Sequence, residues 1–483
     1  MGHLADLHRR FSRARANQSK GGAASIEALH DIWSEAGLPD VSLEHVALRG
    51  AEPVLPSSFA VGTAAQVSIA AAGLAAAEIW HLRGRPRQQV AVDMLAAAQE
   101  CRSHFVINGV TPDLWDKLSG SYRCGDGGWV RIHANFAHHR DGALALLGCP
   151  AGATREDVAQ ALQRWKALEF EQVAADAGLV VAAMRSFHEW DALPQAAALA
   201  GQALVSIERI GDADPRPWPK YGPEARPLQG IRVLDLTRII AGPVGGRTLA
   251  AYGADVMLVN SPHLPNIDNI IDTSRGKLSA HADLETADGR IALGHLLRSA
   301  HVFMQGYRPG GMQALGFGPQ EVARIRPGIV YASLSAYGPQ GPWAARRGFD
   351  SLVQTATGFN QAEAEAAGQS SPKPLPMQIL DYASGFLMAF GVQAALARQA
   401  TEGGSWHVRV SLARTGLWLR RLGRVPGGLS CPMPEIGSLL ETSPSGFGTL
   451  SAVPHAARFS LTPAGWARPS VPPGTHPAAW PSS

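Results

Sequence analysis

One carboxylate in this sequence stands where it could act as a nucleophile. Asp381 lies in MQILDYASGF, residues 377–386, between four mostly apolar residues and a long apolar run. We expect the residues before it to form a buried strand and the run after it to form a buried helix. An Asp ahead of a helix caps free backbone N–H groups, and the helix dipole there keeps its carboxylate ionised. If its outer face is open, the same carboxylate can attack an acyl carbon. On this stretch alone, capping is the commoner role.

Length and composition limit what kind of protein carries this residue. The chain has 483 residues, of which 46% are hydrophobic and 17% charged, so we expect a globular protein with two or more domains. A net charge of +3 gives no electrostatic argument for nucleic-acid binding. We find no uncharged apolar run of about 18 residues, and no apolar segment behind the basic residues at the N-terminus, HRRFSRARANQSK. The sequence therefore predicts a cytoplasmic protein that associates with neither a membrane nor nucleic acid.

The cysteines support the same compartment and argue against a metal site. They lack CxxC spacing and have no histidine pattern nearby, so they predict neither a zinc site nor a disulfide framework. The four positions are Cys101, Cys124, Cys149 and Cys431.

The chain divides into four parts by its pattern of apolar residues. Residues 228–420 alternate apolar strands such as IRVLDL and ADVMLVN with helices, the first of which ends at Gly253. This alternation predicts an α/β fold with a Rossmann-like open parallel sheet as the large domain. Residues 1–212 mix an Ala-rich buried helix with short strands and surface helices, which predicts a smaller α+β domain. Residues 213–227 predict a linker, and residues 421–483 form a tail rich in Pro, Gly and Ser.

A similar sequence pattern occurs once in the first block and once in the second. Residues 64–98 and 383–416 both contain small residues, an Ala-rich helix, an Arg at its end, a polar turn and a strand with the pattern V-x-V. The shared order predicts a partial duplication. Asp381 has no counterpart in the first copy, because SSFAVGTAAQVS contains no acid.

Taken together, these segments resemble the class III CoA-transferases, the CaiB/BaiF family. The resemblance covers most of residues 228–416 through PLQGIRVLDLTRIIAGP, LAAYGADVMLVNSP, YRPGGMQALGFGP and RPGIVYASLSAYGPQGPWAARRGFDSLVQTATGF. The first block resembles the later half of the same family through VAVDMLAAA and GDGGWVRIHANF, so the two halves look rearranged or partly duplicated. The resemblance implies a Rossmann-like large domain, a small domain and an interlocked homodimer.

The resemblance also implies an enzyme, a CoA-transferase without a permanently bound cofactor. Its partners would be coenzyme A as an acyl-CoA thioester and a carboxylic acid. Asp381 would be the nucleophile, forming first a mixed anhydride and then an aspartyl-CoA thioester. Lys277 would lie near the CoA phosphates or adenine, although a solvated surface charge is the alternative, and Tyr307 would lie beside the CoA, although packing is the alternative. The residues implied to approach CoA are Ile239, Ile240, Ala241, Gly242, Pro243, Lys277, Tyr307 and Arg308.

Some positions depart from the family pattern and keep alternatives open. Asn260 stands where the family usually has an acid, and Ala314 where it has a basic residue, so a non-catalytic or degenerate CoA-binding or assembly subunit remains possible. Racemases of the superfamily have a His where this chain has Phe349, which disfavours but does not remove an acyl-CoA racemase or isomerase. Asp350 is expected to be a structural acid. The histidines of AHHR, residues 137–140, lack metal spacing and are expected at the surface.

Two other enzyme classes fail on their motifs. A nicotinamide dehydrogenase needs G-x-G-x-x-G after its first strand and an acid at the end of the second, whereas this chain has AGPVGG and Asn260. A serine hydrolase needs a G-x-S-x-G elbow, which the sequence lacks.

Overall fold

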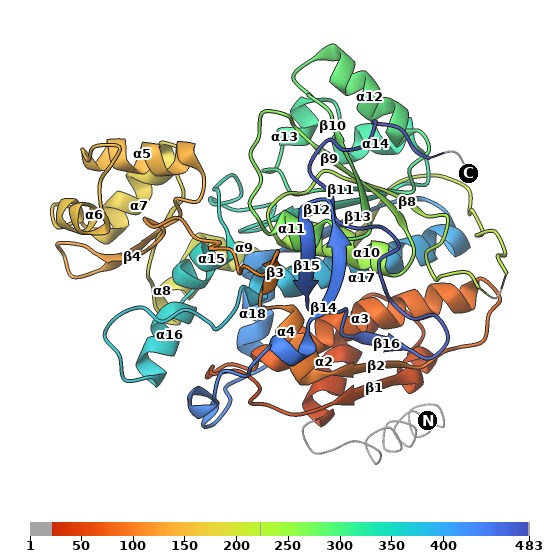
Figure 1. Ribbon diagram of the computed structural model, residues 1–483, viewed down its shortest axis with the longest axis horizontal. Coiled ribbons are helices and arrows are strands. Elements are labelled where there is room, and N and C mark those ends of the chain that lie inside the picture. Colours follow the sequence, from red (N-terminus) through yellow and green to blue (C-terminus); the bar gives the residue numbers. More distant parts are fainter. Residues whose placement is uncertain (1–21, 223, 482–483) are drawn as a thin grey trace.

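The structure is a computed structural model that describes residues 22–222 and 224–481, so the basic segment HRRFSRARANQSK lies outside the described residues (Figure 1). The strands are β1 (Val46–Arg49), β2 (Val90–Asp93), β3 (Phe105–Ile107), β4 (Gly120–Arg123), β5 (Trp129–Ile132), β6 (Val181–Ala183), β7 (Ser206–Gly211), β8 (Arg232–Asp235), β9 (Asp255–Asn260), β10 (Lys277–His281), β11 (Val302–Gln305), β12 (Val330–Ser335), β13 (Ser405–Ser411), β14 (Glu441–Ser445), β15 (Gly448–Ala452) and β16 (Ala457–Phe459). The helices are α2 (Gly22–Glu35), α3 (Val61–Leu82), α4 (Met94–Glu100), α5 (Ala137–Leu147), α6 (Arg155–Leu162), α7 (Ala167–Asp176), α8 (Phe187–Asp191), α9 (Pro194–Ala200), α10 (Ala241–Ala251), α11 (Ile270–Thr273), α12 (Ala287–Leu297), α13 (Gly311–Ala314), α14 (Pro319–Ile325), α15 (Asp350–Ala356), α16 (Phe359–Ala366), α17 (Ile379–Glu402) and α18 (Leu412–Arg421).

A seven-stranded sheet with the order β10-β9-β8-β11-β12-β13-β7 organises the large domain. All neighbours in it are parallel except β13 and β7. Helices connect the parallel strands, and the order reverses between β8 and β11, as in doubly wound sheets. The expected α/β fold with an open, mainly parallel sheet is therefore confirmed.

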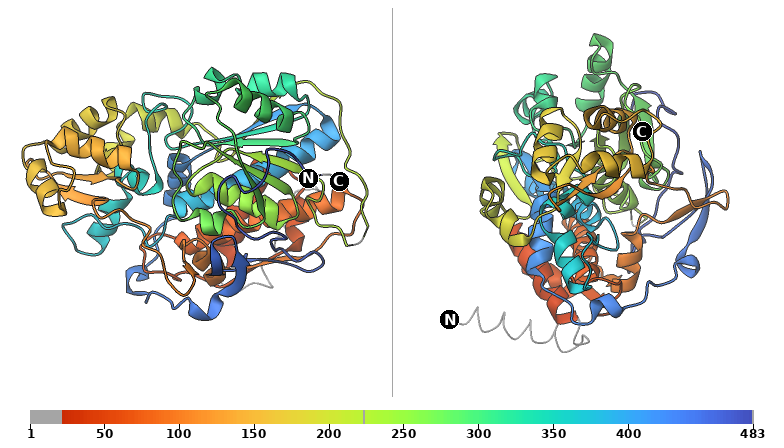
Figure 2. Two further views of the ribbon diagram at one scale, coloured as in Figure 1. Left: turned by 45° about the horizontal axis from the view of Figure 1, so that its top comes forward. Right: turned by 90° about the vertical axis from the view of Figure 1, so that its left-hand side faces the viewer.

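Three smaller sheets complete the fold. Strands β4, β5 and β6 form an antiparallel sheet that, with α5, α6 and α7, makes a lobe beside the large domain (Figures 1 and 2). Strand β16 joins β1 and β2, while β15 lies between β14 and β3. The tail after residue 420 thus adds strands to sheets begun in the first block. In the same way β7, from the first block, pairs with β13 of the large sheet.

The two longest helices form the centre of the core. α3 and α17 pack against each other, and nearly all of their residues are buried. Each is long and apolar enough to cross a membrane by length and composition, but its apolar window is wholly buried inside the protein. Both helices therefore serve as core helices around which the two blocks of the chain assemble.

The segments that echo each other in sequence also fold alike. α3 is followed by β2 and α4, and α17 is followed by β13 and α18. The third residue of α17 is Asp381, whereas the third residue of α3 is Thr63. The N–H of Thr63 donates to Oε1 of Glu52 at 2.7 Å. The helix–strand–helix unit thus occurs twice, with an acid accepting from the first turn of its long helix.

A buried group of charges joins three distant parts of the chain. Arg247 of α10 is 1% exposed and lies between Glu100 of the first block, at 3.1 Å, and Asp272 of the second. Nδ1 of His455, from the tail, lies 3.0 Å from Oε1 of Glu100. Because these side chains are buried, each charge depends on its partners for compensation.

Removing this guanidinium should destabilise the whole fold. Arg247→Gln leaves Glu100 and Asp272 without their shared cation, so we expect the free energy of unfolding to fall by about 3–5 kcal/mol. The control is Arg324→Gln, because the Arg324–Glu321 pair is exposed on α14 and should contribute about 0–1 kcal/mol. Denaturant titrations of both variants make the comparison. Equal effects would contradict a central role for Arg247.

Candidate active site

Asp381 lies within the first turn of α17. The structure corrects two sequence predictions here: residues 377 and 378 form no strand, and Asp381 is not the cap. The helix begins at Ile379, the N-cap is Gln378, and that residue makes no side-chain capping bond. The apolar run before Asp381 is the buried start of the helix rather than a strand.

Asp350, from α15, accepts the backbone hydrogen bonds at the start of α17 that Asp381 was expected to accept. The N–H of Asp381 donates to Oδ2 of Asp350 at 2.9 Å, and the N–H of Leu380 also faces that carboxylate. Gln354 donates to its other oxygen. Asp350 is fully buried, so the expectation of a structural acid agrees with its place beneath the start of α17.

The carboxylate of Asp381 is left without a hydrogen-bond partner among the described residues. It is 7% exposed and lines two cavities. Burial raises its pKa well above the usual range, and the nearby charge of Asp350 raises it further. Burial also raises the pKa of Asp350. A carboxylate that is poorly solvated and unpaired is more reactive as a nucleophile once ionised.

Close packing of α10 on α17 brings a second element to Asp381. A Cβ on Gly385 would collide with the carbonyl oxygen of Ala241, so only Gly permits this crossing. Ile239, just before α10, has φ +78°, which is strained for a β-branched residue. Such strain is held only where surrounding structure enforces it, commonly at functional sites. The segment Ile239–Ala241 is thereby fixed beside Asp381.

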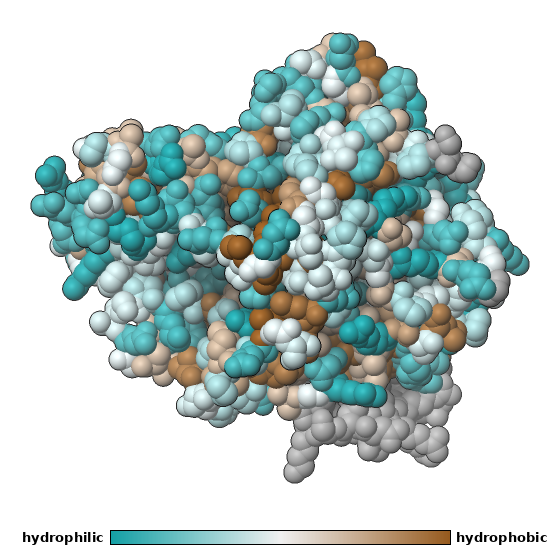
Figure 3. All heavy atoms as spheres, viewed as in Figure 1, coloured by the Kyte–Doolittle hydropathy of each residue, from teal (hydrophilic) through white to brown (hydrophobic). Residues whose placement is uncertain are grey.

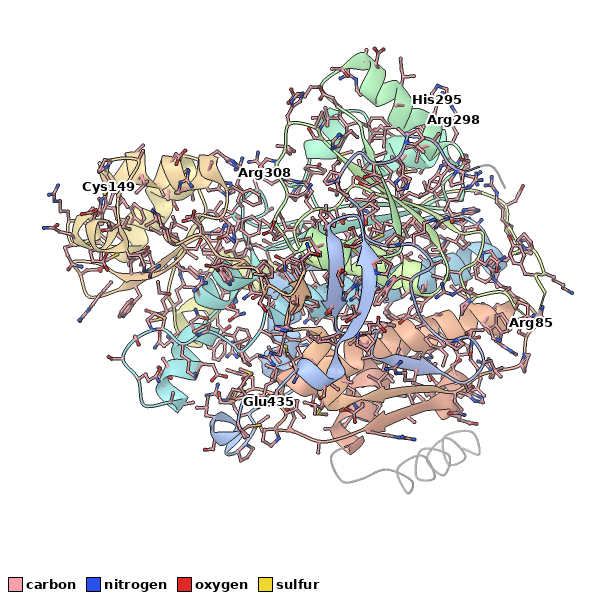
Figure 4. All side chains as sticks on the ribbon, viewed as in Figure 1. Arg85, Cys149, His295, Arg298, Arg308 and Glu435 are labelled. Atoms are coloured by element: carbon pink, nitrogen blue, oxygen red, sulfur yellow. The ribbon has the colours of Figure 1, made fainter. Side chains whose placement is uncertain are left out.

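The first cavity, of about 320 Å³, opens at the carboxyl ends of the parallel strands. Its walls include residues that follow β8, β11 and β12, at the point where the strand order reverses. Ligands bind at this place in open α/β sheets. In Figure 4, Arg308 lies between the lobe that carries α5 and the large sheet.

The structure brings most of the predicted site residues to this cavity. Those that line it are Asp381, Ile239, Ile240, Ala241, Tyr307 and Arg308. Gly242 and Pro243 do not line it, although they follow Ala241 directly at the start of α10. Lys277 is also outside it. Its ammonium group is buried and binds Asp235 at 2.9 Å and the carbonyl oxygen of Pro243 at 2.8 Å.

Several cavity residues were not foreseen from the sequence. Arg238, Arg346 and Arg347 line the first cavity, and so do three aromatic side chains of the first block, Phe136, His138 and His139. The paired arginines in AARRGF could have indicated an anion-binding site. The aromatic residues of the first block could not, because they reach the cavity only through the way the lobe packs on the large domain.

The expected surface position of the AHHR histidines is wrong for one of them. His139 is 4% exposed, and its Nε2 lies 2.9 Å from the guanidinium of Arg347. Burial, followed by the charges around it, lowers the pKa of His139 to about 3, so it accepts from Arg347 as a neutral ring.

A second cavity, of about 290 Å³, lies against the other side of Asp381. It shares Ile239, Ile240, Phe349 and Asp381 with the first. His133 of the first block stacks on Phe349 with ring centroids 4.1 Å apart. Burial lowers the pKa of His133 to about 3, so its imidazole is neutral at physiological pH. Figure 3 shows apolar side chains gathered near the middle of the face, between the lobe and the paired strands β14 and β15.

Comparison with known proteins identifies related chains. The sequence model of CoA-transferase family III matches residues 228–422. An acyl-CoA transferase from Gibberella moniliformis is 30% identical over 406 residues, which cover 74% of this chain and 70% of the relative. That share exceeds what residues 228–483 can supply, so the match continues into the first block, and the relative shares the order of the blocks.

Two further relatives match a smaller part. The acetyl-coenzyme A transferase nodX from Hypoxylon pulicicidum is 36% identical over 42% of this chain and 36% of its own length. The probable fatty acyl-CoA transferase Rv3272 from Mycobacterium tuberculosis is 34% identical over 39% of this chain and 51% of its own length. A crystal structure of Rv3272 has a TM-score of 0.38 and covers 41% of this chain and 57% of that chain. The chain therefore spans only part of the length of these two relatives.

The raised pKa of Asp381 makes stability depend on pH. Its folded pKa lies above the value of about 3.9 in an unfolded chain, so its contribution is fully present below that pH and is lost as pH rises. Asp381→Asn cannot ionise. We therefore expect the stability of this variant relative to the wild type to increase as pH rises from 4 to 8.

Thermal denaturation of both proteins across this pH range makes the measurement. A stability difference that stays constant or shrinks as pH rises would contradict a raised pKa.

Proposed function

We propose that this chain, which belongs to CoA-transferase family III, transfers CoA between carboxylic acids with Asp381 as its nucleophile. The observation that carries the proposal is the carboxylate of Asp381, which has no hydrogen-bond partner among the described residues and faces two cavities at once. One cavity can hold a thioester while the other holds the acid that leaves or enters.

The chemistry proceeds in four exchanges. A carboxylate oxygen of Asp381 attacks the thioester carbon of acyl-CoA; the C–S bond breaks and leaves a mixed anhydride and a CoA thiolate. The thiolate then attacks the side-chain carbonyl carbon of Asp381, which releases the first acid and forms an aspartyl-CoA thioester. The acceptor carboxylate attacks that carbon and expels the thiolate again. Attack of the thiolate on the new acyl carbon gives the product and restores Asp381, with no net proton transfer or redox change.

The first cavity suits the CoA part of the substrate. Arg238, Arg308 and Arg347 line it, and none of them forms an ion pair with an acid among the described residues. Guanidinium groups bind phosphates through paired hydrogen bonds. We propose that Arg308 and Arg347 hold the CoA phosphates. The rest of the CoA moiety would contact Ile239 to Ala241 and Tyr307. Lys277 would act indirectly, by holding the start of α10 through Pro243.

Racemisation is less well supported than CoA transfer. Phe349 cannot take a proton, and the imidazole stacked on it, that of His133, has a pKa lowered to about 3 by burial. A base that weak is poorly matched to removing a proton at physiological pH. A non-catalytic CoA-binding subunit is the other alternative, and the unpartnered Asp381 argues against it, since a binder gains nothing from a buried unpaired carboxylate.

The remaining expectations belong to the same proposal. All four cysteines are free, which suits a reducing cytoplasm. A homodimer stays a prediction from the family resemblance, to be measured by light scattering of the purified protein.

Asp381 should be the site of a covalent adduct. After incubation with a panel of acyl-CoA thioesters and hydroxylamine or borohydride trapping, we expect mass spectrometry to find the adduct on the peptide that contains Asp381. Asp381→Ala should lose the adduct and at least about 10³-fold of transferase activity, because the covalent route is removed. The control is Asp288→Ala, an exposed acid on α12 that lines neither cavity. A folded wild-type protein without any adduct would instead support the binding subunit.

Arg308 should act on CoA affinity. Arg308→Gln removes a charge-assisted contact to phosphate, so we expect KM for the CoA thioester to rise by about 10- to 100-fold with little change in kcat. The control is Arg324→Gln, an exposed arginine that lines neither cavity. An unchanged KM in Arg308→Gln would contradict the assignment of phosphates to this wall.

A further inference from the structure

Two arginines that form no ion pair with any described residue line the second cavity. Arg131 of β5 and Arg102, which follows α4, both line it, and both come from the first block. Asp381 is the one carboxylate among the described residues that line this cavity. Two arginines therefore face a space in which the sole acid is the proposed nucleophile.

Of the two arginines, Arg131 gives the stronger evidence for a bound carboxylate. It lies over the ring of Trp115 at 5.3 Å, and its buried Nε has no hydrogen-bond partner. No ion pair or side-chain hydrogen bond joins it to another described residue. The negative charge of Asp350 acts on Arg131, but this carboxylate already accepts hydrogen bonds from the start of α17. A buried donor without a partner is costly, and an arriving carboxylate would satisfy it.

Arg102 is held in place by neutral groups alone. Its guanidinium donates to Oε1 of Gln99 at 2.8 Å and to the carbonyl oxygen of Pro434 at 3.1 Å. Pro434 belongs to the tail, so the tail contributes to this wall. Because both partners are neutral, the charge of Arg102 stays available to a ligand.

The rest of the cavity suits a small acid. Leu375 and Met377 give it apolar walls. Its volume of about 290 Å³ is large enough for a short carboxylic acid. His133 adds no charge, because it is neutral at physiological pH.

We propose that the second cavity binds the acid that exchanges CoA and selects acids with a second carboxylate, held by Arg131 with Arg102 while the first carboxylate reacts at Asp381. This inference rests on the proposed transferase function. The substrate class is therefore a short dicarboxylic acid, and the first block of the chain determines the specificity for it.

The test compares acceptor acids of equal carbon number, with acetyl-CoA as the constant donor. Product acyl-CoA is measured by mass spectrometry for butanoate and butanedioate, and for hexanoate and hexanedioate. We expect the wild type to favour the dioates. Arg131→Gln should lose about 10- to 100-fold in kcat/KM for the dioates, mainly through KM, and change the monoacids by less than about 3-fold. Arg131→Lys should recover part of the preference, because it keeps the charge.

The matched control is Arg123→Gln, an exposed arginine on the neighbouring strand β4 that lines neither cavity. It should leave both acid classes unchanged. Equal loss on monoacids and dioates in Arg131→Gln, or a wild type without preference for dioates, would overturn the inference.

Calorimetric binding separates this inference from the proposed function. Binding of butanedioate to the wild type but not to Arg131→Gln supports the dicarboxylate site even if no aspartyl adduct forms, and that result would count against the transferase proposal alone. An adduct at Asp381 without binding of butanedioate would support the transferase proposal and contradict the dicarboxylate site.

Discussion

The fold depends on the burial of one guanidinium, that of Arg247. Its partners come from the first block and from the second, and His455 of the tail contacts Glu100 from the far end. Buried ion pairs add little net stability compared with a well-packed apolar core. Removal of one partner, however, is strongly destabilising, because it leaves a buried charge uncompensated. Because the paired residues are far apart in sequence, this destabilisation favours the one arrangement in which the right segments meet. The helix that carries Arg247, α10, is also the helix that packs on α17 beside Asp381.

The site follows from this arrangement. Glycines at the crossing let α10 approach α17, and the strained residue Ile239 then lies at the boundary between the two cavities. Asp350 takes over the free N–H groups of α17, which leaves the carboxylate of Asp381 unoccupied. The protein thus uses two acids where a simple helix start needs one. The carboxylate of the second acid has no partner among the described residues because the first accepts from the helix start, and burial together with the charge of the first raises its pKa.

How far the sequence predicted this structure depended on whether the signal was local. Strands of the large sheet such as β8 and β9 were predicted correctly, since apolar periodicity is a property of neighbouring residues. Asp381 does line a cavity, and its role as nucleophile stays a prediction. The start of α17 was placed too late, because the apolar residues before Asp381 fit a strand as well as a buried helix. Burial of Lys277 and His139 could not be foreseen, as it arises from contacts with Asp235 and Arg347, far away in the chain. The two arginines of the second cavity were missed for the same reason.

The repeated helix–strand–helix unit has a consequence for how the two acids arose. In the first copy, Glu52 still accepts from the first turn of α3, while the position matching Asp381 is Thr63. The first copy therefore has the accepting acid and the same order of elements, but no acid at the position of Asp381. The accepting acid is explained by the hydrogen bonds of the helix start, whereas the same bonds do not require an acid at the position of Asp381. What the first copy supplies is packing, because its long helix α3 lies against α17 and supports the helix that carries Asp381.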